Sequence, residues 1–230
     1  MTRGIRASLL WLVTGCAAPA LAGSYPARAP VAAYMMASPA TEIALARTAA
    51  PPSISGDAEV LVLGPHGYTV AVKGKNGFVC LVERAWDAEF VNPVFWNPHN
   101  RGPDCLNPAA ARSVLPHMLE RTRWAVAGLS IAQMRERTKA EVAAKRYVMP
   151  EPGAMAYMLS KQQYPADDVH NWHPHLMFFV AASDAAMGAN LPGSPLLHAA
   201  PSAPDPVATF LVAVDKWSDG TPAMKQGEGE

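Results

Sequence analysis

One block of helix-forming sequence lies between two blocks of strand-forming sequence, and this order limits the fold more than any other feature. The strand-like runs, rich in apolar, β-branched and aromatic residues, lie at 59–63, 68–72, 78–82, 154–160, 176–180 and 209–214. The helix-forming runs lie at 108–127 and 131–146, with a shorter one before the first strand at 39–49. This order predicts an α+β fold, with a mixed or antiparallel sheet of about six strands and the two central helices packed on one face. The layout is loosely profilin-like or PAS-like.

Turn-forming residues separate the first three strand runs. Gly64-Pro-His-Gly67 comes first and Gly74-Lys-Asn-Gly77 second. Because Asn-Gly favours the positive φ of a tight hairpin turn, we expect an antiparallel meander. Alternation along the third run places Leu81 and Glu83 on the face opposite Cys80.

Capping residues mark the ends of the central helices. Asn107-Pro108 combines an N-cap side chain with proline at the first helical position. Ser130 and Gln133 fit a capping box for the second helix. Pro116 must kink or split the run at 108–127.

The N-terminus has the three parts of a secretory signal peptide. Arg3 and Arg6 provide a basic start, an apolar run follows at 7–18, and Ala20-Leu-Ala22 is an A-x-A cleavage site. The apolar run is too short to span a bilayer as a permanent helix, so no transmembrane segment is expected in the mature chain. We predict a signal peptide at 1–22.

A second processing route is open. Val13-Thr-Gly-Cys16 resembles the lipobox of bacterial lipoproteins, in which the cysteine is lipidated and becomes the new N-terminus. We favour cleavage after Ala22, because the A-x-A site is good and the lipobox lacks its usual leucine. Both routes predict a periplasmic or secreted protein, which lipidation at Cys16 would anchor to the membrane.

The rest of the chain divides into three parts. Residues 23–37 have no periodicity and are expected to be a flexible linker, 38–222 a single α+β domain, and 223–230 a disordered tail. The whole chain has 19 basic and 19 acidic residues, and removal of the signal peptide takes Arg3 and Arg6, which leaves a formal charge of −2. This near-neutral charge argues against a nucleic-acid partner.

Two free cysteines remain in the mature chain on either route. An oxidising compartment favours a disulfide between Cys80 and Cys105. It would pin the long proline-containing loop that runs from Trp86 to Pro103. The alternative is two buried thiols.

A histidine-rich stretch has the residues most typical of a reactive site. His170, His173 and His175 lie within six residues, just after Asp167 and Asp168. Neutral imidazole is the commonest metal ligand, so the three could hold a divalent metal such as zinc. The H-x-H pair lacks the glutamate that follows it in cupins. The alternative is a rigid strand entry whose imidazoles hydrogen-bond loop backbone.

Polar residues at strand ends could add groups to such a site. They are Lys73, Glu83, Lys161, Gln162 and Gln163. Each is more simply explained as a residue on the rim of the sheet.

Several blocks of the sequence resemble a group of uncharacterised exported bacterial proteins. These blocks lie at 72–84, 155–163, 172–179 and 189–195, and the resemblance covers most of the chain past Glu42. It implies an exported domain and no particular activity.

Common enzyme motifs are absent from the sequence. It has no G-x-S-x-G elbow, no S-x-x-K, no glycine-rich phosphate loop and no H-E-x-x-H. We therefore expect a non-catalytic exported domain that binds a small ligand or a component of the cell envelope. The alternative is a metal-dependent enzyme centred on His170, His173 and His175.

Overall fold

The computed structural model describes residues 25–167, 172–184, 187–199 and 203–223. Its helices are α1 (Pro39–Arg47), α2 (Pro52–Ser55), α3 (Pro108–Ser113), α4 (Leu115–Val126) and α5 (Ile131–Ala143), with short 3-10 turns η1 (Val31–Tyr34), η2 (Ala85–Asp87) and η3 (Ala182–Asp184). Its strands are β1 (Glu59–Gly64), β2 (Gly67–Val72), β3 (Val79–Glu83), β4 (Gly102–Leu106), β5 (Met155–Met158), β6 (His175–Ala181), β7 (Leu196–Ala199) and β8 (Val207–Ala213). Among these residues, no helix has the length and apolar character needed to cross a membrane.

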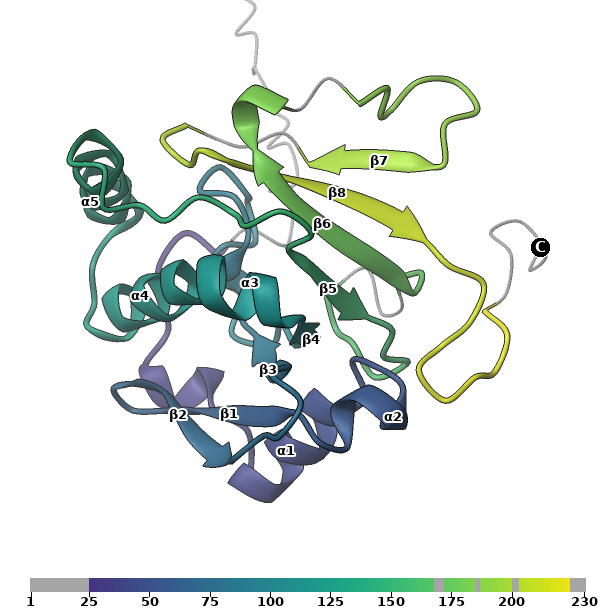
Figure 1. The fold of residues 1–230 in the computed structure, drawn as a ribbon. Coiled ribbons are helices and arrows are strands. Elements are labelled where there is room, and N and C mark those ends of the chain that lie inside the picture. Colours follow the sequence, from purple (N-terminus) through teal and green to yellow (C-terminus); the bar gives the residue numbers. More distant parts are fainter. Residues whose placement is uncertain (1–24, 168–171, 185–186, 200–202, 224–230) are drawn as a thin grey trace, which may run out of the picture.

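The strands of the described residues form one eight-stranded sheet in the order β2-β1-β3-β4-β5-β6-β8-β7 (Figure 1). β1 and β3 are parallel, and the other neighbouring strands in this described part pair antiparallel. The predicted α+β class and mixed sheet are confirmed. The sheet is larger than the six strands expected, because β4 and β7 were not foreseen.

The expected meander of the first three strands is wrong. β1 and β2 form a hairpin, but β3 lies on the other side of β1 and runs parallel to it. The segment 73–78 must therefore pass the start of β1, and Gly74 permits this because a Cβ there would lie 2.2 Å from the backbone nitrogen of Glu59. The Asn76-Gly77 turn is present, with a φ of 78° at Gly77. It leads the chain past β1 instead of folding it back onto β2.

β4 begins inside the loop that was expected to run from Trp86 to Pro103, and a proline in a strand is unusual. The proline is tolerated because only Cys105 and Leu106 of β4 pair with β5, so the N–H that Pro103 lacks is not needed on that side. β4 brings Cys105 directly opposite Cys80 of β3.

Helices cover both faces of the sheet around β3 and β4. α1 packs on the face that carries Cys80, Val82 and Cys105. α3 and α4 pack on the other face, which carries Leu81 and Leu106. In Figure 1, α1 lies below β1 and α4 lies above it.

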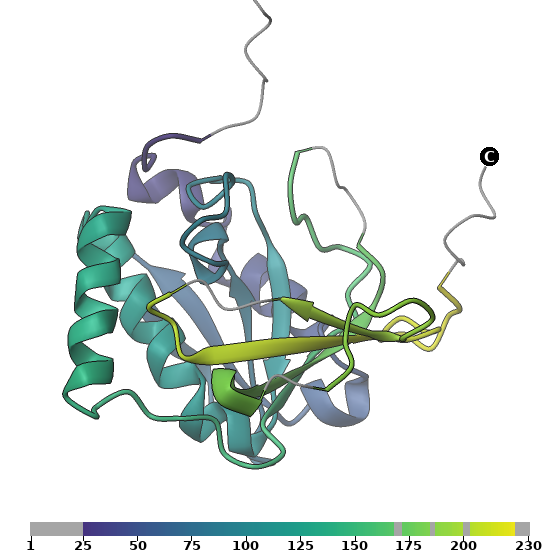
Figure 2. The ribbon, with the colours of Figure 1, turned by 90° about the horizontal axis from the view of Figure 1, so that it is seen from above.

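The helical run at 108–127 is split in two, as Pro116 predicts. α3 ends at Ser113 and α4 begins at Leu115, so Pro116 lies in the first turn of α4. The second helical run, α5, lies beside α4 at the edge of the molecule, where Met134 joins Trp124 in a buried aromatic cluster (Figure 2). Of the two helical runs expected on one face, only the first packs there, as α3 and α4, whereas the second, α5, forms an outer layer.

The described part of the expected linker, 25–37, is held against the domain. Tyr34 is fully buried in the aromatic cluster. Its hydroxyl donates to the Trp96 carbonyl at 2.9 Å, and its own carbonyl accepts from Arg84 Nε at 2.8 Å. The folded unit therefore includes residues assigned to the linker, because one aromatic side chain anchors them.

A buried ion pair ties α1 to the end of β3. Arg84 Nη2 lies 2.8 Å from Glu42 Oε1, and both side chains are almost fully buried. Glu42 also accepts from the backbone N–H of Leu63 at 3.1 Å. Hydrogen bonding of this kind is what makes a buried charge tolerable. The charge of Arg84 is therefore paired with the charge of Glu42.

Some expected features lie outside the described residues. They are the signal peptide at 1–22 with Cys16, the imidazole of His170, and all but the first residue of the tail at 223–230.

Candidate functional site

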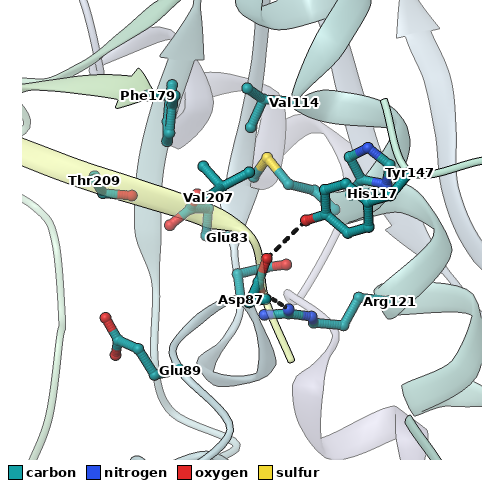
Figure 3. A pocket seen from close by; sticks show the side chains of 12 residues that line it. Glu83, Asp87, Glu89, Val114, His117, Arg121, Tyr147, Phe179, Val207 and Thr209 are labelled. Carbon is teal, nitrogen blue, oxygen red and sulfur yellow. Dashed lines mark hydrogen bonds and ion pairs between the residues drawn. The ribbon is translucent and has the colours of Figure 1, made fainter. Parts of the chain in front are cut away.

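Two adjoining cavities open on the face of the sheet that α3 and α4 cover. The helix-side cavity, of about 120 Å³, lies between α4, β6 and β8 (Figure 3). The loop-side cavity, of about 280 Å³, lies between β5, β6, β8 and the loop 84–101. Both are lined by Glu83, Asp87, Glu89, Phe179 and Thr209. The acids therefore stand at the junction of the two cavities.

Strand register places Glu83 and Asp104 side by side. In the antiparallel pair of β3 and β4, Leu81 lies opposite Asp104 and Glu83 lies opposite Gly102. Residues opposite each other, and residues two apart on one strand, point to the same side of a sheet. A Cβ at Gly102 would lie 3.0 Å from Met158 Cε, so the glycine leaves room for the Met158 side chain next to Glu83.

Asp104 is fully buried, and neither of its carboxylate oxygens has a hydrogen-bond donor at good geometry. Burial raises the pKa of Asp104 to about 7, while interactions with the Glu83 carboxyl and the Cys105 amide oppose the rise. Burial also raises the pKa of Glu83 well above its ordinary value, and the charge of Asp104 raises it further. Two carboxyl groups this close disfavour double ionisation, so the pair retains a proton near neutral pH.

Asp87 is the third acid of this group, and like Glu83 it lines both cavities, whereas Asp104 lines neither. One of its oxygens caps η2 by accepting from the Arg84 backbone N–H at 3.0 Å, and the other, Oδ1, is buried without a partner. Burial raises the pKa of Asp87 to about 6, against the lowering effect of the Arg84 amide. Glu83, Asp87 and Asp104 thus form an acidic cluster whose buried oxygens are short of donors.

The nearest cation on α4 is already paired. Arg121 makes an ion pair with Asp205, which also accepts from the Tyr147 hydroxyl at 2.8 Å (Figure 3). The guanidinium of Arg121 lies 4.4 Å from the centre of the Phe90 ring, and the Tyr147 ring stacks on His117 at 3.6 Å. This group forms the far wall of the helix-side cavity. The charge of Arg121 opposes the rise in the pKa values of Glu83 and Asp87, but burial is the larger effect.

The loop-side cavity has an apolar floor and a polar wall. The floor is formed by Met158, Met177, Phe179 and Leu211 from three neighbouring strands. The wall includes Arg101, whose Nη1 donates to the carbonyl oxygens of Pro98 and Asn100 at 2.8 and 2.6 Å. Burial and the nearby Arg84 lower the pKa of Arg101 to about 10. An apolar floor beside a few polar groups is typical of small-molecule sites.

The histidine stretch is described in part. His173 and His175 line one small cavity together with Trp172, as an extended H-x-H segment predicts. His175 Nδ1 lies 2.8 Å from the His173 carbonyl oxygen, and burial lowers the pKa of His175. The described residues contain no group of three His, Cys, Asp or Glu side chains arranged to hold a metal. Since His170 lies outside them, the three-histidine site stays a prediction.

Cys80 and Cys105 form a cross-strand pair at disulfide distance, with sulfur atoms 2.01 Å apart. The pair lies on the α1 face of the sheet, opposite the cavities. It therefore cross-links β3 and β4 behind the acidic cluster.

The polar residues expected at strand ends have different fates. Glu83 and Gln163 line the loop-side cavity, whereas Lys73 and Gln162 are exposed and Lys161 pairs with Asp219 at 2.8 Å. Glu83 is therefore more than a rim residue.

Sequence reasoning missed Asp87 and Asp104. The available signal was the alternation that places Glu83 on the same face as Leu81, since an acid there faces helices instead of solvent. The partner acids lie in a turn and in an unforeseen strand, where no local pattern marks them.

No known protein family, curated protein or solved structure matches this chain. The profilin-like or PAS-like layout thus has no support from a solved structure. The chemistry of the site has to be inferred from its own side chains.

Proposed function

We propose that this domain binds a small organic molecule in the loop-side cavity. The observation that carries the proposal is an apolar-floored cavity lined by Glu83 and Asp87, where Glu83 interacts with the buried Asp104 and Oδ1 of Asp87 is buried without a partner. Buried polar groups without partners are costly, and proteins retain them mainly where a ligand or a reaction uses them. An apolar cavity with a few converging polar groups is the usual form of a ligand site.

Binding is favoured over catalysis by what surrounds the cluster. Its acids are largely buried beside one another. The cations nearby are already paired, Arg84 with Glu42 and Arg121 with Asp205. Among the described residues, the cluster faces no serine or cysteine nucleophile within the cavity lining. A recognition role needs only the acids and the apolar floor.

The metal-dependent alternative rests on a separate observation. His173 and His175 line one cavity, so two imidazoles from the same segment are available there. We keep zinc among the molecules to be tested for this reason.

A probe set separated by charge tests the ligand-binding proposal. Small cationic, neutral and anionic molecules, and zinc, would be measured by ligand-observed NMR and by thermal shift. Ala88→Trp should abolish binding of those that enter the cavity, because Ala88 lines the loop-side cavity and an indole there would fill part of it. Ala71→Trp, on the exposed edge strand β2, is the matched control and should retain binding. Equal binding to all three proteins, or no binding to the wild type, contradicts the proposal.

We further propose that the domain is exported and works in the periplasm or outside the cell. The exported proteins that its sequence blocks resemble suggest the same location. A cysteine pair at disulfide distance supports this. Mass analysis of the protein from its native envelope should find a chain that starts at Gly23 or at a lipidated Cys16. A chain that retains Met1 in a soluble cytoplasmic fraction would overturn the proposal.

A further inference from the structure

We propose that the loop-side cavity takes a small primary ammonium ion with a short apolar chain, whose charged end is held by Glu83 and Asp87. This inference rests on the ligand-binding function proposed above and names the chemistry of the ligand.

The charges that line the cavity are unbalanced. Glu83, Asp87 and Glu89 all line it, and no cationic side chain of the described residues lies at ion-pair distance from any of them. The basic groups of the lining are Arg84, which is paired with Glu42, and Arg101, which is held by loop carbonyls. The cavity therefore lacks a positive charge beside its acids.

In the acidic cluster, the atoms that lack hydrogen-bond partners are all acceptor oxygens. Oδ1 of Asp87 is buried without a donor, and neither oxygen of Asp104 has a donor at good geometry apart from the proton that it shares with Glu83. Glu83 lines the cavity and Asp104 does not, so a ligand in the cavity meets the pair at Glu83. An ammonium group carries three N–H donors and no acceptor, and it is a compact point charge. It supplies what this end of the cavity lacks.

The apolar floor favours an organic cation. Met158, Met177, Phe179 and Leu211 can cover a short alkyl chain, which gains free energy when it leaves water. A divalent metal would instead need several converging oxygen ligands at 2.0–2.6 Å. The described residues have no group of three such side chains in that arrangement.

Binding should release a proton. In the empty site the Glu83 and Asp104 carboxyls share one, and an adjacent ammonium stabilises the ionised form of Glu83. The exchange is balanced: the cation enters, and the Glu83 O–H bond breaks to leave a carboxylate and a proton that passes to solvent. The other titratable or charged groups that line the two cavities are Arg84, Asp87, Glu89 and Arg101 from the loop, His117 and Arg121 from α4, Tyr147 after α5, His175 from β6, and Asp205 before β8.

Isothermal titration calorimetry with three isosteric probes tests the inference. The probes are butylammonium, 1-butanol and butyrate, each titrated at pH 6.5 in two buffers of different ionisation heat. Butylammonium should bind at least tenfold more tightly than either of the others, and its apparent heat should differ between buffers by the release of up to one proton. Equal affinity for butylammonium and 1-butanol would overturn the inference.

Charge-neutral variants locate the binding group. Glu83→Gln and Asp87→Asn should each weaken butylammonium binding at least tenfold, and Glu83→Gln should also remove the proton release. Glu136→Gln, an exposed acid on α5, is the control and should change neither. If Glu83→Gln unfolds, which its melting curve reveals, Asp87→Asn still decides the matter, and wild-type affinity in that variant contradicts the inference.

The two proposals fail differently. If 1-butanol or butyrate binds and Ala88→Trp abolishes it, while butylammonium does not bind, the cavity is a ligand site of another chemistry. If none of these probes or the wider set binds, both proposals fall.

Discussion

Individual residues of the acidic cluster lower the stability of the folded state. Glu83 and Asp104 are held side by side, and neither oxygen of Asp104 has a protein donor at good geometry. Buried acids that lack partners raise the free energy of the folded state when ionised. Groups with strongly shifted pKa values tend to gather at functional sites, which is how we interpret this cluster.

The cluster makes a prediction about pH. The raised pKa values of Asp104 and Glu83 mean that the folded state binds more protons than the unfolded state between about pH 4 and pH 7. Their contribution to stability is therefore present at low pH and is lost as the pH rises through the folded-state pKa. The lowered pKa values of His117 and His175 act in the opposite direction, so the effect has to be isolated with a variant.

Asp104→Asn isolates it, because an amide cannot ionise. Relative to the wild type, this variant should become steadily more stable from pH 5 to pH 8 in urea denaturation. Asp57→Asn, at an exposed position, should track the wild type at every pH. A difference between Asp104→Asn and the wild type that stays constant across this range would show that Asp104 does not titrate there.

At the scale of elements, local patterns identified most helices and strands but not their neighbours. β1, β2, β3, β5, β6 and β8 were each expected within a few residues of where they lie. β4 was missed because a proline such as Pro103 is unusual in a strand. β7 was missed because only four of its residues pair. The parallel pairing of β1 with β3 depends on how 73–78 passes β1, and a turn motif at Asn76-Gly77 does not encode that.

The pairing of β3 with β4 makes a prediction about the cysteines. Cys80 and Cys105 are 25 residues apart, and in the chain-entropy model a cross-link that closes a loop of about this length contributes on the order of 3 kcal/mol. The double variant Cys80→Ala, Cys105→Ala should lose about this amount in urea denaturation. Wild-type protein whose disulfide has been reduced should have the same unfolding free energy as the variant. Reaction of both thiols with maleimide in unfolded, unreduced protein would show that the bridge is absent.

At the scale of the whole molecule, the site could not be predicted because no short segment contains it. Its acids come from β3, η2 and β4, its floor from β5, β6 and β8, and its wall from the loop 84–101. These parts meet only after the sheet has formed. The histidine stretch attracted attention because its residues are close in sequence, whereas the acidic cluster spans two strands and a turn.

The boundary of the folded unit is a property of the whole molecule as well. A chain that begins at Tyr25 should be as stable as the mature protein, whereas one that begins at Ser38 loses Tyr34 and its hydrogen bonds to Trp96 and Arg84. Removal of a large buried aromatic side chain costs about 3–5 kcal/mol. The shorter chain should lose at least this amount of unfolding free energy in urea.

Tyr34→Ala in the longer chain separates the side chain from the segment. It should account for most of the loss, about 3–5 kcal/mol, because Tyr34 is fully buried among aromatic rings. Met35→Ala, at a neighbouring exposed position, is the matched control and should change the unfolding free energy by less than about 0.5 kcal/mol. If the chain that begins at Ser38 is as stable as the one that begins at Tyr25, residues 25–37 are the linker that the sequence indicates, and the folded unit begins at α1.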